Sequence, residues 1–136
     1  MDQQLQATVL VVEDSPLFLR MLSDMLQSQG FTRVVEARSG RAAKELLAGA
    51  RPDLVCLDLT LPDISGYDVC EHIRATPGLE DLPVLMISAR TQAADRAEAE
   101  EVGASGYLMK PFTPEKLQQQ VARVMALPHH GQPPGA

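Results

Sequence analysis

The sequence is poor in cysteine, has no long apolar run and shows no cluster of basic residues. Its two cysteines, Cys56 and Cys70, fall within apolar stretches, which favours small buried side chains over a disulfide or a metal pair. No apolar run approaches the roughly 20 residues that span a bilayer, and residues 1–7 are polar and glutamine-rich, unlike a signal peptide. A formal net charge of -6 without a basic stripe argues against direct nucleic-acid binding. We therefore expect a cytoplasmic protein without a direct membrane or nucleic-acid partner.

The length of 136 residues fits one domain with a sizeable core. Hydrophobic residues make up 45% of the chain and charged residues 22%, which is ordinary for a globular protein. We expect the folded domain to cover residues 8–127, after a disordered N-terminal segment of residues 1–7. Residues 128–136 offer little to bury, so they are expected to form a flexible tail or the start of a linker.

Five short apolar runs predict β-strands. They cover Thr8–Val12, Arg33–Ala37, Leu54–Asp58, residues 83–88 and residues 105–109. The run before Asp58 has no polar alternation, which is typical of strands buried on both faces of a parallel sheet. Strands that alternate with helices predict an α/β fold with helices on both faces of the sheet. Right-handed crossovers leave few topologies, among them the flavodoxin-like strand order 2-1-3-4-5.

Capping residues and apolar stripes predict a helix after each strand. The caps are expected at Asp14 or Ser15, at Ser39 and at Thr113, with Pro16 and Pro114 near the first helical positions. The expected inner faces are Phe18, Leu19, Leu22, Met25 and Leu26 in the first helix, Ala43, Leu46 and Leu47 in the second, Val69, Cys70 and Ile73 in the third, Ala94, Ala97 and Val102 in the fourth, and Leu117, Val121, Val124 and Met125 in the fifth. Because residues 91–102 have the thinnest apolar face, we expect that helix to be the least firmly packed.

Charged and hydroxyl side chains stand at the carboxyl ends of four predicted strands. They are Glu13 and Asp14 after the first strand, Asp58 at the end of the third, Ser88 at the end of the fourth and Lys110 after the fifth. Open α/β sheets place their functional groups at this edge, and in the 2-1-3-4-5 order the first and third strands are neighbours. Three carboxylates beside one ammonium group would leave a net charge of about -2, which favours a bound cation.

Magnesium suits this set of residues. Mg²⁺ prefers octahedral oxygen ligands, uses one or two carboxylates and keeps waters that a phosphoryl oxygen can replace. The expected ligands are Asp14, Asp58, Glu13 through a water molecule, and the backbone carbonyl of Thr60. The other Asp58 oxygen could then attack phosphorus and form an aspartyl phosphate. Lys110 and the Ser88 hydroxyl would neutralise the phosphoryl oxygens, so Asp58, Lys110 and Ser88 form the candidate catalytic set.

These residues belong to a longer pattern of separated positions. The pattern is Glu13-Asp14, Asp58 followed by Leu61-Pro62 and Gly66, Ser88-Ala89, Tyr107 and Lys110-Pro111. In type, order and spacing it resembles the receiver domain of two-component response regulators, the CheY-like family, from about Thr8 to Met125. Two departures are small. Ser88 stands where threonine is commoner, which keeps the hydroxyl, and Thr60 occupies a variable position that influences the dephosphorylation rate.

The resemblance implies a flavodoxin-like (βα)5 domain whose Asp58 accepts a phosphoryl group from a histidine kinase or a histidine phosphotransfer protein, with Mg²⁺ required. It implies that Lys110 contacts the phosphoryl group and that a cis peptide joins Lys110 to Pro111. Ser88 and Tyr107 would form the switch: the hydroxyl moves toward the phosphoryl group and the ring turns inward. The surface of the fourth helix, fifth strand and fifth helix would then change, and would control an output domain, a partner protein or a second copy in a homodimer.

Three other functions are weighed against this one. A phosphohydrolase of the haloacid dehalogenase type needs a second aspartate two residues after the nucleophile, where Thr60 stands, so turnover of outside substrates is not expected. A flavodoxin-like cofactor binder would place phosphate beside Glu13 and Asp14, which would repel it. A pseudo-receiver that acts only as a binding module is disfavoured because no pocket residue is missing. The domain is thus expected to catalyse only its own phosphoryl transfer and dephosphorylation.

The output is left open by the sequence. No helix-turn-helix, zinc finger or enzymatic motif follows the last helix. The chain either works alone through protein contacts or was cut from a longer regulator, and the proline- and glycine-containing end slightly favours the second alternative.

Overall fold

The computed structural model describes residues 7–89 and 93–127. Within these residues the elements are β1 (Thr8–Val12), α1 (Pro16–Ser28), β2 (Arg33–Ala37), α2 (Gly40–Gly49), β3 (Leu54–Asp58), α3 (Gly66–Ala75), β4 (Val84–Ser88), α4 (Ala93–Glu101), β5 (Gly106–Met109) and α5 (Pro114–Met125). The strands are parallel and lie in the order β2-β1-β3-β4-β5, which confirms the predicted fold class. The segments expected to be disordered or flexible fall outside the described residues, apart from Ala7. None of the helices described is long and apolar enough to cross a membrane.

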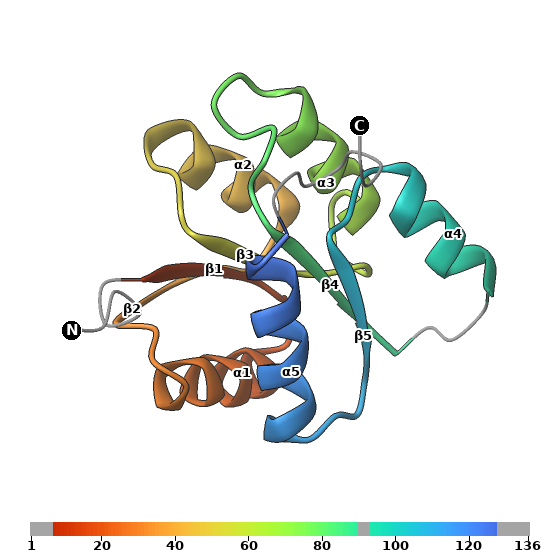
Figure 1. Cartoon of the computed structure of the whole chain (residues 1–136). Coiled ribbons are helices and arrows are strands. Elements are labelled where there is room, and N and C mark those ends of the chain that lie inside the picture. The colour runs from red at the N-terminus through yellow and green to blue at the C-terminus, as the bar shows by residue number, and fades with distance from the viewer. Residues whose placement is uncertain (1–6, 90–92, 128–136) are drawn as a thin grey trace.

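Helices cover the sheet from both sides, with α1 and α5 on one face and α2, α3 and α4 on the other (Figure 1). Successive side chains of a strand point to opposite faces. Along β1, Val9 and Val11 therefore join the core under α1 and α5, whereas Leu10 and Val12 join the core under α2, α3 and α4. The two cores explain why β3 and β4 carry apolar residues at every position before their last residues, Asp58 and Ser88.

Side-chain caps begin three of the helices at the predicted residues. Ser15, Ser39 and Thr113 each accept a hydrogen bond from a backbone N–H group in the first turn of α1, α2 and α5. Gly30 follows α1 with a φ of 112°, a backbone conformation that glycine adopts without strain. The cysteines also agree with the prediction, because Cys56 and Cys70 are free and buried.

Two residues that were predicted to lie on the inner faces of their helices are partly exposed. Leu46 on α2 is 40% exposed, and Met125 on α5 is 38% exposed. Leu46 borders an open hollow beside β1 and β2 that its buried neighbour Leu47 also lines, so its side chain is only partly covered. The buried residues of α2 are Gly40, Ala43 and Leu47, and the neighbours of Gly40 are Ile64 and Val69, so the start of α2 packs against α3 and the loop before it. The first residues predicted for the fourth and fifth strands, Pro83 and Ser105, also precede β4 and β5 by one position.

The predicted inner face of the fourth helix is confirmed at Val102 and is wrong at Ala97. Ala97 is exposed, whereas Asp95, Ala99 and Val102 are buried. These three residues are spaced four and three apart, so they form one side of the helix. Residues 91 and 92 of the predicted helix and the side chain of Ala94 lie outside what the structure describes. An acidic residue thus occupies the inner side that the sequence pattern assigned to alanines.

Candidate functional site

Glu13 lies directly beyond β1, with its side chain fixed on two sides. Its backbone N–H donates to the carbonyl of Ala37 at the end of β2, 3.0 Å away. The Ser15 N–H donates to Glu13 Oε2 at 3.0 Å, and the Lys110 ammonium group contacts Oε1 at 3.0 Å. Glu13 is buried to 2% exposure, whereas Asp14, the next residue, is exposed. The two neighbouring acids therefore have different environments, one paired and buried and one open to solvent.

Asp58 ends β3 beside β1 and is only 7% exposed. The Thr60 N–H donates to Asp58 Oδ1 at 3.2 Å, and the Lys110 ammonium lies 3.6 Å from Oδ2. Burial raises the pKa of the Asp58 carboxyl from 3.8 to about 6, and the negative charge of Glu13 adds to the rise. Lys110 and the Thr60 N–H lower it only in part. In the metal-free protein the carboxylate of Asp58 is therefore poorly compensated.

The loop after β3 brings glycine against the candidate phosphoacceptor. The Gly66 N–H donates to the carbonyl of Leu59 at 2.9 Å. A Cβ atom on Gly66 would lie 2.4 Å from the backbone carbonyl oxygen of Asp58, closer than real Cβ atoms approach an oxygen. A side chain at position 66 would displace the backbone of Asp58, which explains the place of this glycine in the sequence pattern.

Ser88 belongs to β4 and Lys110 directly follows β5, and these two strands lie on the opposite side of β3 from β1. Ser88 ends β4 and is 1% exposed, and its carbonyl accepts a hydrogen bond from the Lys110 N–H at 2.9 Å. The Lys110–Pro111 peptide is cis, as the resemblance implied. Tyr107 lies earlier on β5, is half-buried, and has the guanidinium group of Arg96 5.6 Å from its ring centre. Ser88 and Lys110 thus share the edge of the sheet with the acids, whereas Tyr107 lies beside α4.

The acidic side chains are close enough to share one cation. One oxygen from each of Glu13, Asp14 and Asp58 lies within 4.8 Å of the other two. Carboxylate oxygens this close to one another can bind the same divalent ion, and Mg²⁺ combines carboxylate ligands with water. The residues present therefore fit a magnesium ion, which would also offset the charge that raises the pKa of Asp58.

One residue beside the site was assigned to the core by its helical spacing alone. Phe18, in the first turn of α1, has the Lys110 ammonium 4.1 Å from its ring centre. Its ring also meets that of Phe112 edge-on, with centres 5.8 Å apart and planes at 87°. The helical pattern placed Phe18 on the inner side of α1, but nothing in it indicated a contact with a residue beyond β5.

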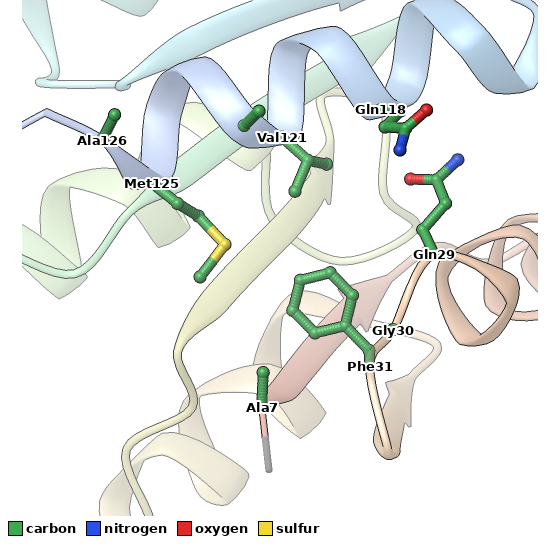
Figure 2. A pocket seen from close by; sticks show the side chains of 9 residues that line it. Ala7, Gln29, Gly30, Phe31, Gln118, Val121, Met125 and Ala126 are labelled. Atoms are coloured by element: carbon green, nitrogen blue, oxygen red, sulfur yellow. The ribbon is translucent and has the colours of Figure 1, made fainter. Parts of the chain in front are cut away.

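A hollow of about 340 Å³ lies at the opposite edge of the sheet from the acids. Figure 2 shows the ring of Phe31 between Ala7 and Val121, with Gln29 and Gln118 at one end of the hollow. Its lining residues include no acidic, basic or nucleophilic side chain, so the hollow is not a candidate catalytic site. The acidic edge remains the candidate site.

The comparison with protein families gives a match over most of the chain. Residues 9–122 match the response regulator receiver domain. The chain is 42% identical over 118 residues to the DNA-binding response regulator MtrA of Mycolicibacterium smegmatis, covering 87% of this chain and 49% of that protein. It therefore spans about half the length of this relative. It is also 32% identical over 116 residues to the chemotaxis protein CheY of Pseudomonas aeruginosa PAO1, covering 85% of this chain and 94% of CheY.

A solved structure resembles this one and contains the expected metal. It is the receiver domain of a sensor histidine kinase from Pseudomonas aeruginosa PAO1, which is 30% identical and has a TM-score of 0.82 over 89% of this chain and 98% of that chain. A magnesium ion is coordinated in its active-site cleft.

Proposed function

Because this chain belongs to the receiver domain family of two-component response regulators, we propose that Asp58 is its phosphoacceptor and that phosphorylation switches its surface. The observation that carries the proposal is the grouping of Glu13, Asp14 and Asp58 oxygens within 4.8 Å, with the Lys110 ammonium 3.6 Å from Asp58. A buried nucleophile, a cation site and a fixed positive charge are what phosphoryl transfer to a carboxylate requires.

The donor is the phosphohistidine of a histidine kinase or a phosphotransfer protein. An oxygen of Asp58 forms a bond to phosphorus, while the bond from phosphorus to the imidazole nitrogen breaks and its electron pair stays on that nitrogen. Lys110 and the Ser88 hydroxyl then face the phosphoryl oxygens, whose charge they offset. Because Lys110 is already held by Glu13 at 3.0 Å, little reorganisation is needed when charge arrives at Asp58.

Glu13, Asp14, Asp58 and the Thr60 carbonyl would hold Mg²⁺. When bound, the ion supplies positive charge that orients and neutralises the phosphoryl group. Glu13 Oε1 and Oε2 already contact Lys110 and the Ser15 N–H, which favours an indirect role for Glu13, through a water molecule. Asp14, which is exposed, and Asp58 are then the direct carboxylate ligands.

The switch is formed by Ser88 and Tyr107, and its output surface by α4, β5 and α5. Movement of the Ser88 hydroxyl toward the phosphoryl group would open space for the Tyr107 ring, which would then leave the guanidinium of Arg96. A hollow of about 290 Å³ beside Tyr107 is lined by residues of all three elements, among them Arg96, Gln120 and Arg123. An inward turn of the ring would reshape this hollow, and an output domain, a partner protein or a second copy would recognise the change.

Hydrolysis of outside phosphoesters is a weaker alternative. It requires an acid and base two residues beyond the nucleophile, and position 60 carries a threonine whose N–H donates to Asp58. We therefore assign the domain to signalling in the cytoplasm, with catalysis limited to its own phosphoryl transfer and dephosphorylation.

The direct test uses the protein with Mg²⁺ and acetyl phosphate, followed by intact mass and peptide mapping. We expect one added phosphoryl group at Asp58, lost in Asp58→Asn and when the metal is chelated. The matched control is Asp81→Asn, which removes an exposed carboxylate without touching the site and should label as the wild type does. Equal labelling of Asp58→Asn and the wild type would show that the phosphoacceptor is a different residue.

A further inference from the structure

The Lys110 ammonium lies among three groups that come from three elements. Glu13 Oε1 is 3.0 Å away, Asp58 Oδ2 is 3.6 Å away, and the ring centre of Phe18 is 4.1 Å away. The face of an aromatic ring is negative, so it attracts a cation placed over it. The long, flexible lysine stem does not fix the ammonium by itself. The ring therefore gives the ammonium a third attractive contact, in addition to the two carboxylates.

Phe18 is itself held in place. Ser15 Oγ accepts from the Phe18 N–H in the first turn of α1, and the Phe18 and Phe112 rings lie nearly perpendicular, at 87°. Edge-to-face contact is a preferred geometry for aromatic pairs. Phe112 follows Lys110-Pro111, so the same short segment supplies both the cation and the ring that steadies Phe18. Lys110 and Phe112, which both contact the Phe18 ring, are therefore held two residues apart in the chain.

We propose that Phe18 is a positioning residue for phosphoryl transfer: its ring face holds the Lys110 ammonium between Glu13 and Asp58, ready for the incoming phosphoryl group. This inference rests on the proposed function of Asp58 and adds a residue outside the set of acids, hydroxyl and lysine. Leucine at position 18 would fill much of the same half-buried space but would leave the ammonium without a ring face.

The contact itself is tested by NMR without a phosphodonor. Protons held over a ring face shift upfield, so the ε-methylene protons of Lys110 should be shifted upfield in the wild type. We expect this shift to be lost in Phe18→Leu and kept in Phe18→Tyr. The matched control is Phe31→Leu, which removes a ring from the opposite edge of the sheet (Figure 2) and should leave the Lys110 signals unchanged. An unshifted Lys110 in the wild type would overturn the proposal.

The consequence for chemistry is tested by the initial rate of phosphorylation by acetyl phosphate at saturating Mg²⁺. Phe18→Leu should slow it about five-fold, the loss expected for a cation–π contact of ordinary strength. Phe31→Leu should not slow it. The decisive series replaces Phe18 with phenylalanines carrying one, two and three ring fluorines, which withdraw charge from the ring face and barely change its shape. The rate should fall stepwise with each fluorine.

The two proposals fail in different ways. If the wild type is not phosphorylated at Asp58, the proposed function fails, while the Lys110 shift still reports whether the ring holds the ammonium. If the wild type is phosphorylated and the fluorinated proteins react as fast as it does, Phe18 serves packing only and the positioning role is wrong. A rate that rises on fluorination would mean that the ring restrains Lys110 from the phosphoryl group, which also overturns the proposal.

Discussion

At the scale of single residues, the folded protein is less stable when the Asp58 carboxyl is charged than when it is protonated. Its folded-state pKa of about 6 exceeds its ordinary value of 3.8, chiefly because the carboxyl is buried and secondly because Glu13 is near. A carboxyl with a raised pKa binds its proton more tightly in the folded state. The stability that it contributes is therefore fully present below 3.8 and is lost as the pH rises through 6.

We predict that Asp58→Asn stabilises the metal-free protein at about pH 8, by up to about 3 kcal/mol, because asparagine carries no charge to bury. The gain should shrink toward zero as the pH falls to about 4, where the wild-type carboxyl is protonated. Urea unfolding in the presence of a chelator, at several pH values, measures the difference. A gain that is equally large at low pH would point to a packing effect instead of charge.

Magnesium should stabilise the wild type more than Asp58→Asn. A ligand that binds only the folded state stabilises it by mass action, so Mg²⁺ should raise the unfolding midpoint of the wild type and have little effect on Asp58→Asn. Asp81→Asn, which alters an exposed acid, should respond to Mg²⁺ as the wild type does. A full response by Asp58→Asn would remove Asp58 from the set of ligands.

Sequence reasoning located the acids and the lysine because strand ends are fixed by pattern and the order of parallel strands brings them to one edge. It could not place Phe18 beside Lys110, since that contact depends on the rotation of α1 and on two side-chain rotamers. It also missed that the Glu13 carboxylate binds both the Ser15 N–H and the Lys110 ammonium. These contacts depend on backbone positions that residue spacing in the sequence does not reveal.

At the scale of elements, α4 is attached through a polar contact. The Tyr67 hydroxyl in the first turn of α3 lies 3.1 Å from the carbonyl and 3.3 Å from Oδ1 of Asp95, which is 6% exposed. The sequence pattern favoured alanines for this side because it has no means of pairing Asp95 with a tyrosine 28 residues earlier. Tyr67 directly follows Gly66, which packs on the backbone of Asp58, so α4 is connected to the site through α3.

We predict that Tyr67→Phe destabilises the protein by about 1–2 kcal/mol, since it removes a buried donor from Asp95. The amides of α4 should exchange with deuterium faster, whereas those of α5 should be unaffected. Hydrogen exchange read by mass spectrometry separates the two helices. Equal acceleration in both helices would indicate global unfolding and would contradict a local role for the contact.

The loop between β3 and α3 is tied to α2 by Asp63. Its carboxylate accepts from the Gly40 and Arg41 N–H groups, each at 2.9 Å, and these hydrogen bonds lower its pKa to about 2. A carboxyl with a lowered pKa contributes stability that is present above 3.8 and is lost only as the pH falls through 2. Asp63→Ala should therefore speed amide exchange at Gly40 and Arg41 at neutral pH, as NMR would detect, while the exchange of β4 stays unchanged.

At the scale of the whole molecule, the sequence predicted a sheet covered by helices on both faces. It did not predict how much of each helix is buried. Unbroken apolar runs such as β3 require cover on both faces, and alternating elements with right-handed crossovers leave few other arrangements. Leu46 and Met125 are partly exposed because each borders an open hollow beside the amino-terminal ends of the strands, which a stripe of apolar residues does not reveal. The extent of a buried face depends on the neighbours of the helix, and these are known only once the fold is formed.

If Ser88 and Tyr107 form the proposed switch, a change at Asp58 should reach the surface of α4, β5 and α5. Beryllofluoride with Mg²⁺ forms a stable mimic of the phosphoryl group, and its binding to the wild type should shift the NMR signals of α4, β5 and α5. Ser88→Ala should bind Mg²⁺ normally, since Ser88 is not a proposed ligand, yet should show smaller shifts at Tyr107 and Arg96. Ser23→Ala is the matched control, because it removes another buried hydroxyl, on α1, that donates to Glu36 at 2.8 Å. Full shifts at Tyr107 in Ser88→Ala would mean that the change reaches β5 without the hydroxyl, and the role of Ser88 in the switch would be wrong.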